Sequence, residues 1–168
     1  MWMAQTTASG MVPWYHWLGG APKDLRWRET GRAFFDWIAA NEPHFVNRAS
    51  IANIGVVFSQ RGNELYRPPG GSDATEFLEG LYYALLKTRL PFDFVHEDDL
   101  SPETLRKYKA LLLPNVALLS DAQCRQLEAF AAGGGSLLAT FETSLYDEQG
   151  KARSDFGLAR LFEITKTG

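Results

Sequence analysis

From Ile51 onward, short apolar segments alternate with segments whose apolar residues recur at helical spacing. The apolar segments are short and rich in Val, Ile, Leu and Phe, so they predict strands. We expect these strands at residues 51–59, 92–96, 110–113 and 136–141. Strands that alternate with helices are joined by right-handed crossovers. The pattern therefore predicts an α/β fold: an open, mostly parallel, flavodoxin-like sheet with helices on both faces.

The helices expected between these strands begin at capping residues. They cover residues 73–87, 101–108 and 120–132. Ser120 and Gln123 form a capping box, and the glycines at 133–135 supply the left-handed residue that ends the last helix. We expect a loop at residues 60–72 and a short amphipathic turn at residues 156–162.

The first 50 residues have a different character, because all five tryptophans lie within the first 37 residues. We expect residues 1–10 to be frayed and residues 11–24 to form a short strand that ends in a loop. A helix is expected from about Leu25 to Asn41, stopped by Pro43. The chain is therefore divided into an aromatic-rich arm, residues 1–50, and an α/β domain, residues 51–168.

Composition excludes several classes of protein. The net charge of -3 gives no reason to expect a nucleic acid or an anionic membrane as partner. The single cysteine, Cys124, rules out an internal disulfide framework. No apolar run approaches the roughly 18 residues of a membrane span, and residues 1–10 lack the features of a signal peptide. We expect a cytoplasmic protein.

Several segments in order resemble a known family: YKALLLPNVALLSD at residues 108–121, LEAFAAGGGSLLATFET at 127–143, FDFVHEDDL at 92–100 and FGLARLF at 156–162. They resemble the trimerisation domain of microbial β-galactosidases, which has a class I glutamine-amidotransferase-like fold, and the likeness spans roughly residues 51–164. Upstream, PWYHW at 13–17 and RAFFDW at 32–37 resemble the last strand, loop and helix of a (β/α)-barrel glycoside hydrolase.

No catalytic residue is expected. A glycosidase needs two carboxylates about 5 to 10 Å apart, and in the resembled family these lie upstream of this chain. Glu97, Asp98 and Asp99 are adjacent in a loop and are expected to form a solvated connector. Amidotransferase-like enzymes carry a nucleophilic cysteine at the turn that here holds residues 114–117, which include no thiol. Cys124 is expected to pack in a helix interface.

Metal and cofactor sites are not expected either. His16, His44 and His96 fall in separate segments without the spacing of metal ligands. His96 ends a predicted strand, where ligand sites of open α/β sheets gather. We expect it to be a hydrogen-bonded structural histidine.

Six residues are candidates for ligand binding: Trp14, His16, Trp17, Arg61, Asn63 and Asn115. In the resembled barrel, the loop that carries the first three would face a sugar. Alternatively, these aromatic rings cover the sheet domain or a subunit contact. Arg61 and Asn63 follow the first strand, and Asn115 follows the third. These residues could contact a ligand, contact a neighbouring subunit, or simply form exposed surface, and the sequence leaves these alternatives open.

The resemblance implies a non-catalytic accessory domain of a glycoside hydrolase. Its expected roles are oligomerisation, with a homotrimer favoured, and support of a carbohydrate cleft. The alternative is a stand-alone carbohydrate-related binding protein or hydrolase of the amidotransferase-like superfamily, with a site at residues 59–63 and 114–115. A complete minimal glycosidase is disfavoured, because the sequence offers no suitable pair of carboxylates.

Overall fold

The computed structural model of the chain describes residues 2–8, 10–14, 23–45, 49–71 and 73–167. Two compact units make up the chain, residues 1–50 and residues 51–168. That the first of them is the end of a barrel stays a prediction.

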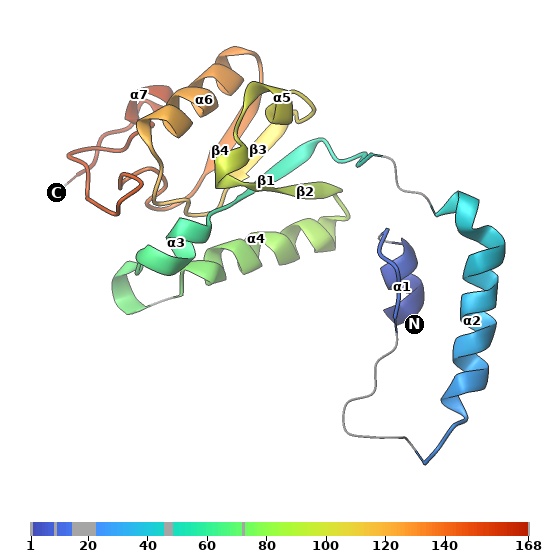
Figure 1. Cartoon of the computed structure of the whole chain (residues 1–168). Coiled ribbons are helices and arrows are strands. Elements are labelled where there is room, and N and C mark those ends of the chain that lie inside the picture. Colours follow the sequence, from blue (N-terminus) through green and yellow to red (C-terminus); the bar gives the residue numbers. More distant parts are fainter. Residues whose placement is uncertain (1, 9, 15–22, 46–48, 72, 168) are drawn as a thin grey trace. The chain divides into compact units, whose positions relative to one another are not determined.

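Within the described residues of the larger unit, four parallel strands form one sheet in the order β2-β1-β3-β4 (Figure 1). The strands are β1 (Ile54–Phe58), β2 (Phe92–His96), β3 (Ala110–Leu113) and β4 (Ser136–Ala139). This is the strand order of a flavodoxin-like sheet. The predicted fold class is confirmed, and the bounds of β2 and β3 agree with the sequence prediction.

Helices lie on both faces of the sheet, as expected (Figure 1). On one face lie α3 (Gln60–Leu65) and α4 (Ala74–Thr88), and on the other lie α5 (Pro102–Leu105), α6 (Asp121–Ala132) and α7 (Ala159–Phe162). Short 3-10 turns occur at Pro69–Gly71 and Glu97–Asp99. Ser120 and Gln123 form the predicted capping box of α6, and Gly134 supplies the left-handed residue after it, at φ 94°.

Helix α3 corrects the prediction of a loop at residues 60–72. The Ser59 hydroxyl caps it by accepting a hydrogen bond from the Gly62 amide at 2.9 Å. A side-chain cap supplies a partner for one of the amide groups that a helix start leaves open. The sequence predicts a loop here because polar composition and a glycine such as Gly62 are typical of loops as well as of short helices.

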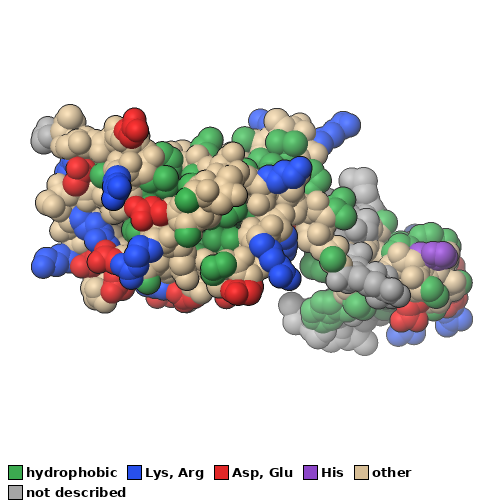
Figure 2. Space-filling model, turned by 90° about the horizontal axis from the view of Figure 1, so that it is seen from above, with side chains coloured by type: hydrophobic (Ala, Val, Ile, Leu, Met, Phe, Trp, Pro, Cys, Tyr) green, Lys and Arg blue, Asp and Glu red, His purple; other side chains and the backbone are tan. Residues whose placement is uncertain are grey.

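The hydrophobic core lies mainly between the sheet and the α5–α6 face. It contains Val57, Val95, Leu111, Leu113 and Leu127, all of them buried. On the other face α4 is packed less deeply, since Leu85 is the one buried residue among its fifteen, all of which are described. Figure 2 looks onto the α5–α6 side, where apolar side chains lie between charged ones. The two faces of the sheet are thus covered unequally.

The smaller unit contains α1 (Trp2–Ala8), α2 (Trp27–Asn41) and a 3-10 turn at Glu42–His44. Helix α1 shows that the prediction of a frayed start was wrong. The Thr7 hydroxyl donates to the Met3 carbonyl at 3.1 Å within this helix. Residues 11–14 do not form the predicted strand, and residues 15–22 lie outside the described residues.

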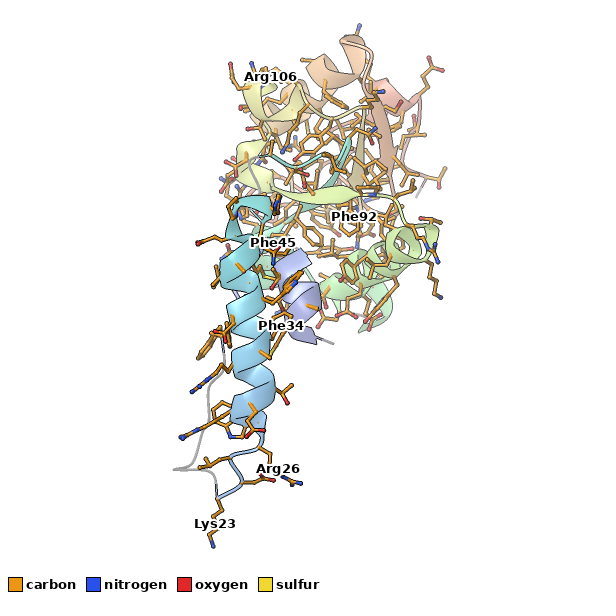
Figure 3. All side chains as sticks on the ribbon, turned by 90° about the vertical axis from the view of Figure 1, so that its right-hand side faces the viewer. Lys23, Arg26, Phe34, Phe45, Phe92 and Arg106 are labelled. Carbon is orange, nitrogen blue, oxygen red and sulfur yellow. The ribbon has the colours of Figure 1, made fainter. Side chains whose placement is uncertain are left out.

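Helix α2 lies close to its predicted range and ends at Asn41, two residues before Pro43. None of its residues, all described, is buried. Phe34, Trp37 and Phe45 form a row of rings: the Trp37 centroid lies 6.4 Å from that of Phe34 and 5.4 Å from that of Phe45. Phe34 and Phe45 are labelled in Figure 3. Among the described helices of the chain, none has the length and apolar character required to cross a bilayer.

Candidate functional site

The carboxyl edge of the sheet brings several predicted site residues together. The strand order reverses between β1 and β3, and ligands of open α/β sheets bind beside such a switch point. Arg61 and Asn63 lie in α3, directly after β1, and Asn115 lies two residues after β3. The next loop of the same edge, after β2, carries Glu97.

Glu97 is the most enclosed of these groups, with 1% of its surface exposed. Its carboxylate accepts hydrogen bonds from the Ser59 hydroxyl at 2.5 Å and from the Arg61 amide at 2.9 Å. The Arg61 Nε atom lies 3.5 Å from the same carboxylate. The Glu97 carbonyl accepts a hydrogen bond from Gln123 Nε2 at 2.8 Å. Glu97 therefore ties together the start of α3, the end of β2 and the start of α6.

The prediction of a solvated connector is thus wrong for Glu97, although Asp98 and Asp99 are exposed. Parallel pairing of β1 with β2 sets Phe58 beside His96, which brings the residues that follow them together. Ser59 and Arg61 then offer donors to the carboxylate, which compensates its burial. Arg61 also pairs with the exposed Asp98. The arrangement positions α3 and leaves the Glu97 carboxylate no open access to solvent.

A second polar group surrounds Asn115, which is 6% exposed. The backbone N–H of Asn115 donates to Thr140 Oγ1 at 3.0 Å, and its side-chain Oδ1 accepts from the backbone N–H of Glu142 at 3.2 Å. Glu142 in turn accepts hydrogen bonds from the Tyr66 hydroxyl at 2.5 Å and the Tyr146 hydroxyl at 3.4 Å. Burial, and after it the bond to Glu142, raise the pKa of Tyr66 above its ordinary value.

The space between these groups is small. A cavity of about 20 Å³ lies beside Ser59, Asn63 and Asn115. Small-molecule sites are usually about 300 to 1,000 Å³ in volume, so this cavity accommodates no sugar in the present conformation. The role of Arg61, Asn63 and Asn115 in binding stays a prediction.

The other candidates are dispersed. Trp14 belongs to the smaller unit and is 70% exposed, while His16 and Trp17 lie outside the described residues. His44 is exposed in the 3-10 turn after α2. Within the described part of the chain, no group of three His, Cys, Asp or Glu residues could hold a metal ion.

Cys124 and His96 have the structural surroundings that the sequence predicted. Cys124 is buried in the core, and burial raises the pKa of its thiol to about 11. A thiol of this kind is almost wholly protonated at neutral pH and is a poor nucleophile. His96 Nδ1 accepts a hydrogen bond from the Asp98 amide at 3.3 Å, and its ring lies 6.0 Å from that of Phe58.

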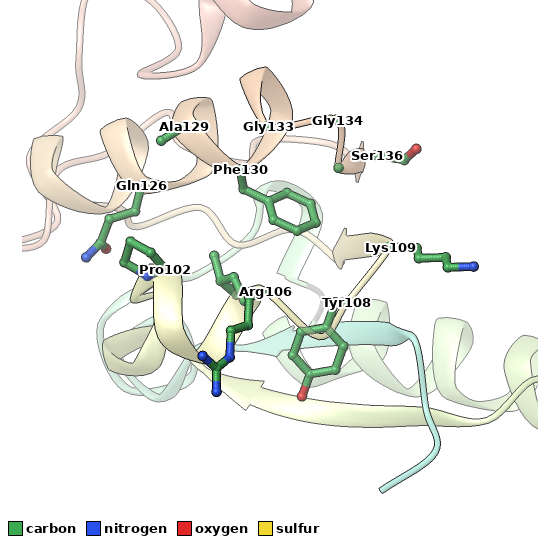
Figure 4. A pocket seen from close by; sticks show the side chains of 12 residues that line it. Pro102, Arg106, Tyr108, Lys109, Gln126, Ala129, Phe130, Gly133, Gly134 and Ser136 are labelled. Atoms are coloured by element: carbon green, nitrogen blue, oxygen red, sulfur yellow. The ribbon is translucent and has the colours of Figure 1, made fainter.

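Sequence reasoning missed a wider hollow of about 480 Å³ at the opposite, amino end of the strands (Figure 4). It lies between α5 and α6, and its walls include Arg106, Tyr108, Lys109 and Phe130. Gly135 permits the close approach of Phe130, since a Cβ at this glycine would lie 2.2 Å from the ring. In the sequence, the glycine run predicts a helix cap and gives no signal for the hollow.

Comparison with known proteins identifies the larger unit. A family model described as the β-galactosidase trimerisation domain matches residues 56–166. The chain belongs to this family. β-Galactosidases of Geobacillus kaustophilus and of a Geobacillus strain are each 31% identical to it over 71 residues, which cover 42% of this chain and 10% of each relative. The chain thus spans about a tenth of the length of these curated relatives.

Solved structures share the fold of this β-galactosidase trimerisation domain. The β-galactosidase from Rahnella sp. R3 is 16% identical with a TM-score of 0.65, over 79% of this chain and 20% of that one. The β-galactosidase from Bifidobacterium adolescentis is 23% identical with a TM-score of 0.60, over 71% and 56% of the two chains. The one from Halorubrum lacusprofundi is 25% identical with a TM-score of 0.56, over 73% and 19%.

Proposed function

We propose that this chain is the assembly part of a glycoside hydrolase related to β-galactosidases, and that its copies form a homotrimer. The family match over residues 56–166, nearly the whole larger unit, carries this proposal. The buried groups at the carboxyl edge support it, because Glu97 is engaged in holding α3 and the turn after β3 has no thiol. The single cysteine suits the reducing cytoplasm, which we propose as the location.

Exposed apolar surface gives the proposal a physical basis. In the larger unit, Tyr83, Phe94, Leu138 and Phe141 are each about half exposed or more. In the smaller unit, α2 has no buried residue, although it carries four aromatic side chains: Trp27, Phe34, Phe35 and Trp37. Phe45 follows the 3-10 turn after this helix. Soluble monomers rarely leave contiguous apolar patches larger than a few hundred Å² in water.

Sedimentation velocity of the full chain tests the assembly. We expect a species of three copies that dissociates on dilution, because association of a homo-oligomer depends on concentration. Circular dichroism of the same sample checks that the chain is folded. A folded species that sediments as a single copy at all concentrations would refute the proposed function.

We further propose that the arm, residues 1–50, is the end of a glycoside hydrolase barrel and lines a carbohydrate cleft. Trp14 is the described candidate for stacking against a sugar, and the relatives' names indicate a β-galactoside. All five tryptophans lie in the arm, so the tryptophan emission of the chain reports on this segment alone.

Galactose titration followed by tryptophan fluorescence tests the role of the arm. We expect a saturable change in emission that Trp14→Ala abolishes, because the substitution removes the aromatic face. Trp37→Phe is the matched control, since it also removes one tryptophan but keeps an aromatic ring. An unchanged emission spectrum of the wild type at all galactose concentrations would exclude this role.

A further inference from the structure

We propose that copies of this chain join head to tail, through two different apolar patches at the opposite edges of the sheet. The inference rests on the proposed assembly and names the surfaces that carry it. Each patch lies on the α4 side of the sheet, where packing within the chain is thinnest.

The first patch, the β2-edge patch, consists of Tyr82, Tyr83, Leu86, Leu90, Phe92 and Phe94. Tyr82 lies at its centre, with ring centroids 5.5 Å from Tyr83, 5.8 Å from Phe92 and 6.2 Å from Phe94. Phe92 is seen on β2, the outermost strand of the sheet as described (Figure 3). Tyr83 is 58% exposed and Phe94 51% exposed, so a connected aromatic cluster faces water.

The second patch, the β4-edge patch, consists of Phe77, Leu138 and Phe141. Phe141 stacks on Phe77 of α4, with ring centroids 5.2 Å apart, yet 56% of Phe141 stays exposed. Leu138 lies on β4, the outermost described strand at the other edge, and is 47% exposed.

Strand alternation places both patches on one side of the sheet. Val95 packs in the core beside α5 and α6, so its neighbour Phe94 faces α4. Leu137 and Ala139 pack against the same core, so Leu138 between them also faces α4. One sheet face therefore has an apolar patch at each edge, with α4 between them.

The net charges beside the two patches have opposite signs, although the exposed Glu79 of α4 lies one helical turn before Tyr82 and Tyr83 of the β2-edge patch. Lys87 and Arg89 adjoin Leu86 and Leu90 of the β2-edge patch, and all four side chains are exposed. Glu76, also exposed, adjoins Phe77 of the β4-edge patch. Opposite charges favour contact between unlike patches, while contact of a patch with its own copy would bring like charges together.

Two unlike patches are what a closed ring of three copies requires, because its interfaces are heterologous. The exposed side chains of the β2-edge patch leave on the order of 400 Å² of surface in water. This is about half of what each partner contributes to a standard interface. A polar rim that includes the flanking charges would supply the remainder, as in other interfaces.

Complementation of two variants tests the pairing of the patches. Phe94→Glu disrupts the β2-edge patch and Leu138→Glu disrupts the β4-edge patch. We expect each variant alone to be a single copy, with a dissociation constant raised at least about tenfold. An equimolar mixture retains one intact patch of each kind, on different chains. We therefore expect it to form a dimer with one chain of each variant, detected by native mass spectrometry.

Trp37→Glu, in α2, is the control for association through the arm, and it should leave the trimer intact. Circular dichroism and thermal unfolding verify that each variant is folded. Because the two glutamates replace half-exposed side chains, we expect melting temperatures close to that of the wild type. If Leu138→Glu unfolds, Phe141→Ser tests the same patch.

Each other outcome overturns a definite part of the proposal. A wild type that is a single copy refutes the proposed function itself, whereas a wild-type trimer with both glutamate variants still trimeric refutes only the patches. Dissociation of the Phe94→Glu variant alone would show that the β4-edge patch is not what the β2-edge patch binds. A mixture that remains monomeric would show that the two patches do not bind one another.

Discussion

Replacement of Glu97 by alanine is expected to lower the free energy of unfolding by about 3 kcal/mol. The substitution removes the acceptor of the Ser59 hydroxyl and of the Arg61 amide, at a position that is 1% exposed. Each donor left without a partner in a buried place costs about 1 to 3 kcal/mol. The start of α3 should loosen as well, since both donors belong to its first turn. Equilibrium unfolding in urea measures the change.

Two further variants separate the contributions at Glu97. Glu97→Gln keeps the size and one acceptor oxygen but places an NH2 group opposite one of the two donors, the Ser59 hydroxyl or the Arg61 backbone amide, so we expect part of the loss to persist. Asp98→Asn is the matched control, because it changes a neighbouring carboxylate that is exposed. Exposed ion pairs contribute about 0 to 1 kcal/mol. Equal effects of Glu97→Ala and Asp98→Asn would show that the buried carboxylate does not hold α3.

The local part of the fold followed from the sequence. Residues 92–96 and 110–113 have the strand bounds that their apolar composition predicts. Ser120 and Gln123 predicted the start of α6, because a capping box involves residues only three positions apart. These features could be predicted because the interactions that create them lie within one turn or one strand.

The features that were missed depend on distant contacts. Three successive acidic residues favour a solvated loop, and no local pattern distinguishes Glu97 from its neighbours. Its burial arises from the pairing of β1 with β2 and from Gln123, which is 26 positions away. The same holds for Leu138, whose apolar character predicts a covered position, whereas α4 leaves it half exposed. Whether a helix covers a given part of a sheet is decided by the whole topology.

The candidate ligand site was also predicted only in part: the positions of its residues were predicted, but the size of the space between them was not. The rule for parallel sheets correctly placed Arg61, Asn63 and Asn115 at one edge, because residues after adjacent parallel strands lie together. The same rule did not predict that Pro114 and Asn115 lie so close to α3 and α4. Their approach leaves a cavity of only about 20 Å³. Side-chain packing at such an edge depends on volumes contributed by four separate segments.

Replacement of Asn115 by valine is expected to cost about 3 kcal/mol of unfolding free energy. Asn115 has a φ of 49°, in the left-handed region, which asparagine adopts more easily than a β-branched residue does. Valine also removes the oxygen that accepts the Glu142 amide at 3.2 Å. Glu142 would then be held less firmly against the Tyr66 hydroxyl. Urea unfolding of the purified variant measures the loss.

Asn115→Gly distinguishes the two causes, because glycine adopts positive φ without strain but provides no acceptor. We expect it to cost about 1 kcal/mol, the contribution of an ordinary hydrogen bond. The difference between the two variants then measures the strain at this turn. If valine and glycine reduce stability equally, backbone conformation is not what selects asparagine here. The side-chain contact with the Glu142 amide would then account for the whole effect, and the turn after β3 would tolerate any small residue able to accept that bond.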